Sequence, residues 1–346
     1  MEDKRKELDV ILREITAGLN GDAEHDGPYL MEQMEKYKSH DLAKEIVRAC
    51  GRLMYNVIPE ESKDKIVQIF GNEHLGVDAT LDEARFNIYK GDFRKAQTIM
   101  ADLIRKIEEL DAYQDDIASE YHTFSEPFEE VLYRFHNEPE KDVRHADIRY
   151  SEIYLLYGTI LVELKDFENA KAALRTALKW NPVGAPIHFE YAEIFKMTED
   201  YEEFFRLTVE AFKYAFRSTD IARCYRNLGF YFIEKELYKE AAGCYFMSTF
   251  FEPDSKQAMS ELYYISTKTN KETVNPSTKD LKKIANKYGF PLGPDDDVVG
   301  LSYVNGKHFY EQEEYRLAGY FWSITYDLIK DEEIKKKLDE IERKMN

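Results

Sequence analysis

The sequence has few cysteines and no run of apolar residues long enough to cross a membrane. Its three cysteines, Cys50, Cys224 and Cys244, are odd in number and form no Cys-x-x-Cys pair. Nothing at Met1–Asn20 has the form of a secretory signal. These absences exclude a disulfide framework, so we expect a reduced, cytoplasmic protein whose thiols are buried and take no part in redox chemistry.

Signatures of catalysis are also absent. The sequence contains no His-Glu-x-x-His, no glycine-rich phosphate loop and no nucleophile elbow. The histidines His122, His136 and His145 match no metal spacing, and the run Asp295–Asp297 lacks the alternation of a calcium loop. We therefore expect no catalytic residue, no metal and no cofactor, and an enzyme of unknown class is the least favoured reading.

Basic residues are fewer than acidic residues. The chain has 67 Asp and Glu against 48 Lys and Arg, which gives a net charge of -19 and a pI near 5.0. Such a balance repels phosphate backbones and anionic membranes, so we expect neither nucleic acid nor a membrane as a partner. Aromatic residues, by contrast, are plentiful at 14% of the chain and suffice for a large buried core.

What the sequence does contain is a repeated pattern of helix, short turn, helix and proline at Ser151–Pro182 and Ala222–Pro253. Each unit has a small residue at positions eight, twenty and twenty-seven and proline at position thirty-two: Gly158, Ala170, Ala177 and Pro182 in the first, Gly229, Ala241, Ser248 and Pro253 in the second. Antiparallel helices approach closely only where small side chains face each other and bulky neighbours fill the gaps. The spacing therefore predicts closely packed helix pairs.

Three more units fit the same frame when counted from Val77, Ala185 and Val299. Their residues at positions eight and twenty are Ala84 and Ala96, Ala192 and Phe204, and Gly306 and Ala318. Position seventeen, just after the turn, is aromatic in all five units: Phe93, Phe167, Tyr201, Tyr238 and Tyr315. Four units carry an acid at position sixteen, which suits the N-terminus of a second helix: Asp92, Asp166, Asp200 and Glu314.

This period of about 34 residues, with small residues at these positions, resembles the tetratricopeptide repeat (TPR). The resemblance implies an all-α fold, an α-α superhelical solenoid, to which the residues before the repeats add an N-terminal helical cap. In order along the chain we expect a helical bundle or cap at 1–76, a TPR-like unit at 77–110, an inserted helix or degenerate repeat at 111–150, TPR-like units over 151–332 with an irregular unit at 256–298, and a C-terminal capping helix at 333–346.

The resemblance also implies a ligand groove lined by the first helix of each unit. Carried over position by position, the groove residues are Leu155, Thr159, Phe189, Glu193, Arg223, Arg226, Asn227, Phe230, Tyr303, Lys307 and Tyr310, with Val162, Met197 and Ile233 at further groove positions. Asn227 matches one asparagine of the carboxylate clamp of chaperone-binding TPR domains, but Leu155 and Thr159 stand where that clamp has lysine and asparagine. We expect no full clamp. Arg223 and Arg226 either receive a partner's carboxylate or pair with Glu193 or Glu234.

These observations favour a non-catalytic scaffold or adaptor that binds a protein or peptide in a concave groove. The alternative is a cytoplasmic sensor of short signalling peptides, whose layout also places a helical bundle before TPR units. Residues 1–75 hold more acids than bases, which disfavours a DNA-reading helix in that bundle. The sequence predicts neither the identity of the partner nor the oligomeric state.

Overall fold

The computed structural model describes residues 2–57, 73–110, 113–115 and 117–345. They form two compact units: an N-terminal unit of Met1–Tyr113 with Ala146–Arg149, and a C-terminal unit of Gln114–His145 with Tyr150–Asn346. Helices dominate both units, so the all-α solenoid class is confirmed. This division groups the helix pair at 77–110 with the helices that precede it, whereas the sequence predicts a boundary after residue 76.

The N-terminal unit consists of α1 (Glu2–Ala17), α2 (Ala23–Lys36), α3 (Ala43–Val57), α5 (Glu73–Tyr89) and α6 (Phe93–Leu110). The turn before α2 is held by Asp26, whose buried carboxylate accepts hydrogen bonds from the backbone N–H groups of Asn20 (3.0 Å) and Gly21 (2.8 Å). Ile15, Leu30 and Ile46, one from each of the first three helices, are almost completely buried together. These three helices therefore form a small bundle with its own core.

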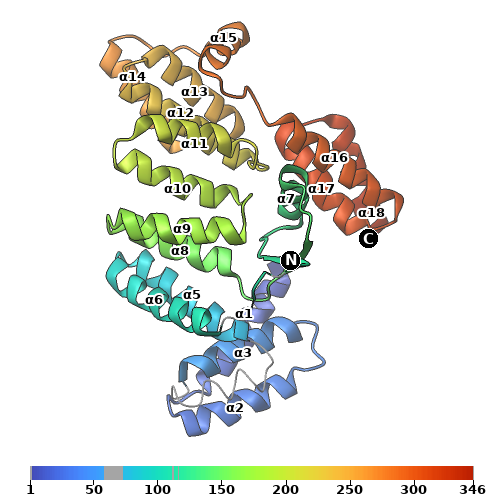
Figure 1. The fold of residues 1–346 in the computed structure, drawn as a ribbon. Coiled ribbons are helices and arrows are strands. Elements are labelled where there is room, and N and C mark those ends of the chain that lie inside the picture. Colours follow the sequence, from blue (N-terminus) through green and yellow to red (C-terminus); the bar gives the residue numbers. More distant parts are fainter. Residues whose placement is uncertain (1, 58–72, 111–112, 116, 346) are drawn as a thin grey trace. The chain divides into compact units, whose positions relative to one another are not determined.

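The C-terminal unit continues from a short β-α-β segment into successive helix pairs. Its elements are β1 (Ser119–His122), α7 (Pro127–Asn137), β2 (Asp142–His145), α8 (Tyr150–Glu163), α9 (Phe167–Trp180), α10 (Ala185–Met197), α11 (Tyr201–Ala211), α12 (Ser218–Glu234), α13 (Tyr238–Phe251), α14 (Lys256–Thr269), α15 (Thr278–Tyr288), α16 (Asp296–Glu311), α17 (Tyr315–Ile329) and α18 (Glu332–Met345). Figure 1 shows α8 to α14 stacked one after another.

The predicted frame fixes the turn inside every pair. Each second helix begins at the aromatic residue of position seventeen, and each first helix ends at position thirteen. Position fifteen takes the left-handed conformation in all five units, with φ between 58° and 77°: Gly91, Lys165, Glu199, Glu236 and Glu313. The backbone N–H of position sixteen then donates to the carbonyl of position eleven, as in Asp166 to Leu161 (2.9 Å), which satisfies an otherwise unpaired carbonyl at the helix end.

Close packing within a pair depends on the glycine at position eight, but its neighbour is not the small residue of position twenty. A Cβ added at Gly158 would lie 2.5 Å from Leu174, one at Gly229 2.7 Å from Tyr245, and one at Gly306 2.3 Å from Trp322. Leu174, Tyr245 and Trp322 all occupy position twenty-four. The expectation that small residues face each other is therefore wrong in detail: a large side chain of the second helix packs onto the bare backbone of the first.

The segment from β1 to β2 contains structure that the sequence does not reveal. Its two strands pair in parallel, with Ser119 opposite Asp142 and His122 opposite His145, and α7 connects them. Helix α7 is capped by Glu126 together with Glu129 and not by Ser125. Phe128 is buried on α7, whereas Phe135 is 44% exposed. Where the sequence predicts an inserted helix or a degenerate repeat at 111–150, the structure thus has helix α7 between two strands that pair with each other.

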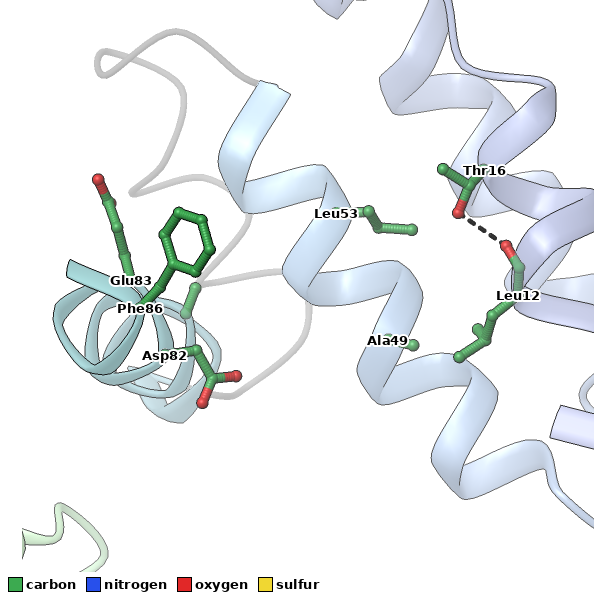
Figure 2. A pocket seen from close by; sticks show the side chains of 8 residues that line it. Leu12, Thr16, Ala49, Leu53, Asp82, Glu83 and Phe86 are labelled. Atoms are coloured by element: carbon green, nitrogen blue, oxygen red, sulfur yellow. Dashed lines mark hydrogen bonds between the residues drawn. The ribbon is translucent and has the colours of Figure 1, made fainter. Parts of the chain in front are cut away.

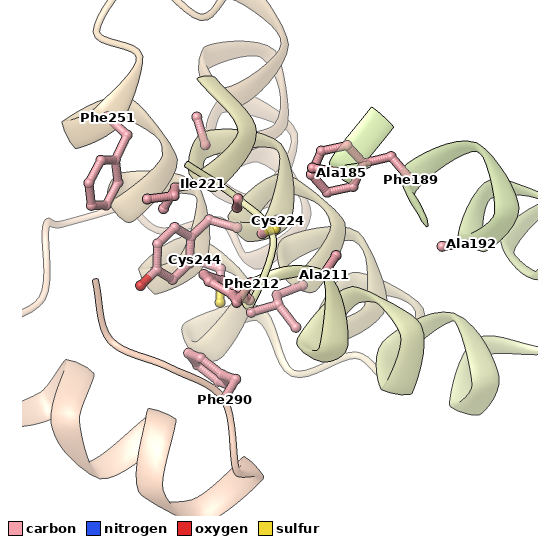
Figure 3. Close-up of a cluster of buried hydrophobic side chains, with 14 of the residues drawn as sticks. Ala185, Phe189, Ala192, Ala211, Phe212, Ile221, Cys224, Cys244, Phe251 and Phe290 are labelled. Atoms are coloured by element: carbon pink, nitrogen blue, oxygen red, sulfur yellow. The ribbon is translucent and has the colours of Figure 1, made fainter. Parts of the chain in front are cut away.

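The core of the C-terminal unit includes two of the three cysteines of the chain (Figure 3). Cys224 and Cys244 are buried and free, and burial raises the pKa of both thiols. Tyr225, buried beside them, donates its hydroxyl hydrogen to the carbonyl of Pro291 (3.1 Å) and accepts the N–H of Gly293 (2.7 Å). These two hydrogen bonds hold the connection between α15 and α16 against Tyr225 of α12.

Candidate functional site

A hollow of about 490 Å³ lies in the C-terminal unit, on the side lined by the first helices of successive pairs. Helices α8, α10, α12 and α14 all contribute to it, and so does the turn after α8. Its walls are polar, and they carry four basic and three acidic side chains. The lining residues are Val162, Glu163, Lys165, Glu190, Glu193, Lys196, Met197, Arg223, Arg226, Asn227 and Gln257.

Two ion pairs form one wall of the hollow, and each rests on an aromatic ring. Arg223 Nη2 lies 2.8 Å from Glu190 Oε1, and its guanidinium is 4.9 Å from the centre of the Phe189 ring. Lys196 Nζ lies 2.9 Å from Glu193 Oε1 and 4.8 Å from the centre of the Phe230 ring. The rings orient the cations by cation–π attraction and shield one side of each from water.

Arg226 differs from Arg223, because several residues of the same unit bind its guanidinium group. Its side chain is only 14% exposed, and it forms an ion pair with Glu252. Its Nη1 also donates to the hydroxyls of Ser248 (3.2 Å) and Ser255 (3.4 Å). Arg226 thus joins α12 to the end of α13 and the start of α14. Both arginines are internally paired, but with Glu190 and Glu252, and not with Glu193 or Glu234.

Four polar side chains in the wall have no hydrogen-bond or ion-pair partner among the described residues. One is an acceptor, the carboxylate of Glu163 at the end of α8. The other three are donors: the ammonium of Lys165, in the turn after α8, the amide of Asn227 on α12 and the amide of Gln257 on α14. Asn227 is only 8% exposed, so its amide is presented to the hollow and little else. A ligand with carbonyl or carboxylate oxygens would satisfy these donors.

The structure brings together only part of the predicted groove. Glu193, Arg223, Arg226 and Asn227 line the hollow with Val162 and Met197. Phe189 is buried and Phe230 is half-buried, and both support the wall from behind without lining the hollow. Thr159, also half-buried, donates its hydroxyl hydrogen to the carbonyl of Leu155, and neither residue lines the hollow.

The predicted groove residues on α16 lie elsewhere. Lys307 Nζ is 3.8 Å from Glu311 of the same helix, and the Tyr310 hydroxyl donates to Glu340 and accepts from Lys344, both on α18. Tyr303 is 39% exposed and lies outside the hollow. The hollow is also lined by residues that the sequence does not predict: Glu163, Lys165, Glu190, Lys196 and Gln257. The frame itself holds the signal for one of them, because Glu190 and Asn227 both occupy position six.

A second hollow, of about 650 Å³, lies in the N-terminal unit (Figure 2). Its floor is apolar, with Leu12, Leu53 and Phe86 among its residues. The two acids at its edge are already engaged, Asp82 with Arg85 (3.5 Å) and Glu83 with Lys95 (4.0 Å). This hollow therefore presents apolar surface, and both of its carboxylates are already paired.

Two classes of site are absent from the described part of the chain. No group of three histidine, cysteine or acidic side chains gathers there to hold a metal ion. None of the helices described is both long enough and apolar enough to cross a lipid bilayer.

Comparison with known proteins supports the repeat. A family model described as tetratricopeptide repeat matches residues 151–183. None of the curated proteins matches the chain significantly. Among solved structures, a tetratricopeptide repeat protein from Parabacteroides merdae is 12% identical, with 93% of this chain and 99% of that chain covered and a TM-score of 0.39. PilF of Pseudomonas aeruginosa is 19% identical, with 51% and 75% covered and a TM-score of 0.32.

These TM-scores are too low to add to the assignment, which rests on the repeat model and on the turns of the helix pairs. The match at 151–183 coincides with α8 and α9, and four further pairs share the left-handed residue and the helix boundaries of that pair. Repeats of this family build scaffolds for protein interaction and are generally non-catalytic. The chain thus contains a tetratricopeptide repeat at residues 151–183.

Proposed function

We propose that this chain is a non-catalytic scaffold that binds an extended segment of another protein in the hollow lined by α8, α10, α12 and α14. The observation that carries the proposal is the set of unpaired donors at Lys165, Asn227 and Gln257, which come from three different repeat units. An extended chain offers a carbonyl at every residue, and so it can meet donors spread along successive units.

The charges of the wall indicate which kind of peptide segment fits the hollow. Four basic and three acidic side chains line the hollow, in a protein whose acids outnumber its bases by 67 to 48. The acids Glu190 and Glu193 are neutralised by Arg223 and Lys196, and Arg226 pairs with Glu252, which leaves the Lys165 ammonium and the Glu163 carboxylate without an ion-pair partner. A segment with a carboxylate near Lys165 and backbone carbonyls near Asn227 fits this arrangement best.

A peptide library displayed on phage tests the proposal. The full chain selects binders, and fluorescence anisotropy measures their affinity for the unaltered protein and for a Lys165→Glu, Asn227→Ala double variant. We expect the double variant to weaken binding at least about tenfold, because charge repulsion replaces attraction and one amide donor is lost.

Lys179→Glu is the matched control, since Lys179 is an exposed lysine on the second helix α9 and does not line the hollow. It should leave the affinity unchanged. Selected peptides that bind the double variant as tightly as the unaltered chain would rule out this hollow as the binding site.

A further inference from the structure

Helix α14 is the first half of a repeat unit whose second half is missing. The frame continues from Ala222 to Lys256, where α14 begins, but the next helix does not pack on it as a second helix should. Helix α15 lies instead against α12 and α13. The nearest atoms to a Cβ added at Gly243 would be those of Leu281 (3.2 Å) and Ile284 (3.6 Å), and the Tyr288 ring is 4.7 Å from the Phe232 ring.

The face of α14 that would receive a second helix is therefore open to solvent. In the paired first helices, positions one, four and eight are mostly buried: Ala222, Tyr225 and Gly229 in α12 and Ser151, Tyr154 and Gly158 in α8. The same positions in α14 are Lys256, Met259 and Tyr263. Met259 is 57% exposed and Tyr263 is 76% exposed. The opposite face of α14, with Ala258, Leu262 and Ile265, is buried in the normal way.

Position eight explains why no second helix packs on this face of α14 within the described part of the chain. Glycine or alanine occupies that position in the five paired units and admits a large side chain from the second helix. Tyr263 fills that space with its own ring. A helix can approach this face only if it presents a small residue opposite Tyr263.

The open face is also locally basic. Within α14 and the turn that begins after it, residues 256–271 hold three lysines against one acid, Glu261, in a chain that is strongly acidic as a whole. Lys256 lies on the face itself, and Lys268 and Lys271 follow at its C-terminal end. All three are exposed, and no described residue forms an ion pair with them. Their charges are therefore available to a molecule that docks beside Tyr263.

We propose that the face of α14 formed by Lys256, Met259 and Tyr263 is a second docking surface, distinct from the hollow, which binds an acidic amphipathic helix of a partner protein. The partner helix would take the place of the missing second helix. It would bring a small residue against Tyr263, apolar side chains against Met259, and carboxylates toward the flanking lysines.

Charge and shape favour this occupant over two others. A second copy docked face to face would bring Lys256 and its flanking lysines against their own counterparts, where like charges repel. A membrane surface would favour a broader apolar face, whereas Met259 and Tyr263 form a stripe one helix wide between polar residues such as Ser260 and Thr267.

Two synthetic helical peptides provide the probe. Both are about 18 residues long, because shorter isolated helices are marginal in water. They share one stripe of alanine and leucine, and the flanks carry glutamate in one and lysine in the other. Fluorescence anisotropy with the full chain should show binding of the glutamate peptide at least about tenfold tighter than binding of the lysine peptide, and added salt should weaken it.

The variants Tyr263→Glu and Lys256→Glu should each weaken the glutamate peptide at least about tenfold, with unchanged melting temperatures, because both side chains are exposed. Tyr89→Glu is the matched control, since Tyr89 is 89% exposed and lies on α5. Lys165→Glu, in the hollow, should have no effect. This last variant separates the present proposal from the proposed function, because either can fail alone.

Three results would overturn the proposal. One is equal affinity for the two peptides, or affinity that Tyr263→Glu does not change. Another is concentration-dependent self-association that Tyr263→Glu abolishes, which would assign the face to a second copy. The third is binding to phosphatidylserine vesicles that the same variant abolishes, which would assign it to a membrane surface.

Discussion

At the scale of single residues, two glycines of α16 differ completely in what surrounds them. A Cβ at Gly306 would lie 2.3 Å from the indole of Trp322, which is almost fully buried, whereas a Cβ at Gly300 would meet nothing within 4 Å. Gly306→Ala should therefore lower the free energy of unfolding by about 1–3 kcal/mol through overpacking. Gly300→Ala, in the same helix, should raise it by about 0.5–1 kcal/mol through helix propensity. Urea unfolding of both variants checks the prediction, and shifts of the same sign would contradict it.

A second residue-scale prediction concerns pH. Asp220 lies in the first turn of α12, and burial raises the pKa of its carboxyl from 3.8 to about 6, against the opposing effects of Arg217 and Arg223. Because the folded pKa exceeds the unfolded one, this group contributes stability below about pH 4 that is lost as the pH rises through 6.

Asp220→Asn removes this dependence, since the amide is neutral throughout. We expect it to raise the free energy of unfolding by about 1–2 kcal/mol at pH 8 and to leave it unchanged at pH 4. Urea unfolding at the two pH values measures both differences. A gain that is larger at pH 4 than at pH 8 would show that the carboxylate is favoured in the folded protein.

At the scale of elements, the turn inside each pair is defined by one backbone conformation. Four of the five units place a residue with a side chain in the left-handed region at position fifteen, and only the unit with Gly91 uses glycine. Glycine adopts that region without steric cost, whereas other residues are strained there by about 1 kcal/mol.

Exchanging the two kinds of residue should have opposite effects. Glu236→Gly, in the α12–α13 turn, should raise the melting temperature because it relieves that strain, and Gly91→Ala, in the α5–α6 turn, should lower it. Thermal unfolding followed by circular dichroism compares each variant with the unaltered protein. If Glu236→Gly proves destabilising, its side chain makes contacts that outweigh the strain.

The frame explains how much of the fold could be predicted from sequence. Helix boundaries follow from local signals, such as the aromatic residue at position seventeen, and these need only neighbouring residues to act. The pairing of β1 with β2 has no such signal, because Ser119 and Asp142 meet only through tertiary structure. The residues of the hollow could be predicted only in part, for a related reason. The position within the repeat indicates which helices line the hollow. It does not indicate that Phe189 is buried or that Arg226 forms an ion pair with Glu252, because both depend on tertiary contacts.

At the scale of the whole C-terminal unit, the chain departs from a simple solenoid, in which each repeat contacts only its neighbours. Helix α7 precedes the stack, yet it contacts the last helix pair. The hydroxyl of Tyr320, on α17, donates to Glu126 (3.0 Å) and accepts the backbone N–H of Phe128 (3.4 Å). The backbone N–H of Ser218, at the start of α12, donates to Asp327 of α17 (2.7 Å). These contacts attach α16 and α17 to earlier parts of the chain.

Phe128 is the apolar centre of that attachment. Its ring is fully buried and lies 5.3 Å from the ring of Phe216, before α12, and 6.0 Å from that of Phe321, on α17. Phe128→Ala should cost about 3–5 kcal/mol, as expected for a large buried aromatic. Because the lost contacts join α7 to α17, hydrogen exchange should accelerate in α16 and α17 and change little in α8 and α9. Phe135→Ala, on the exposed side of α7, is the matched control and should leave exchange in all four helices unchanged. Equal acceleration throughout the unit would mean that the stack and the last helices unfold as one cooperative body, and that Phe128 supports the whole unit and not one attachment within it.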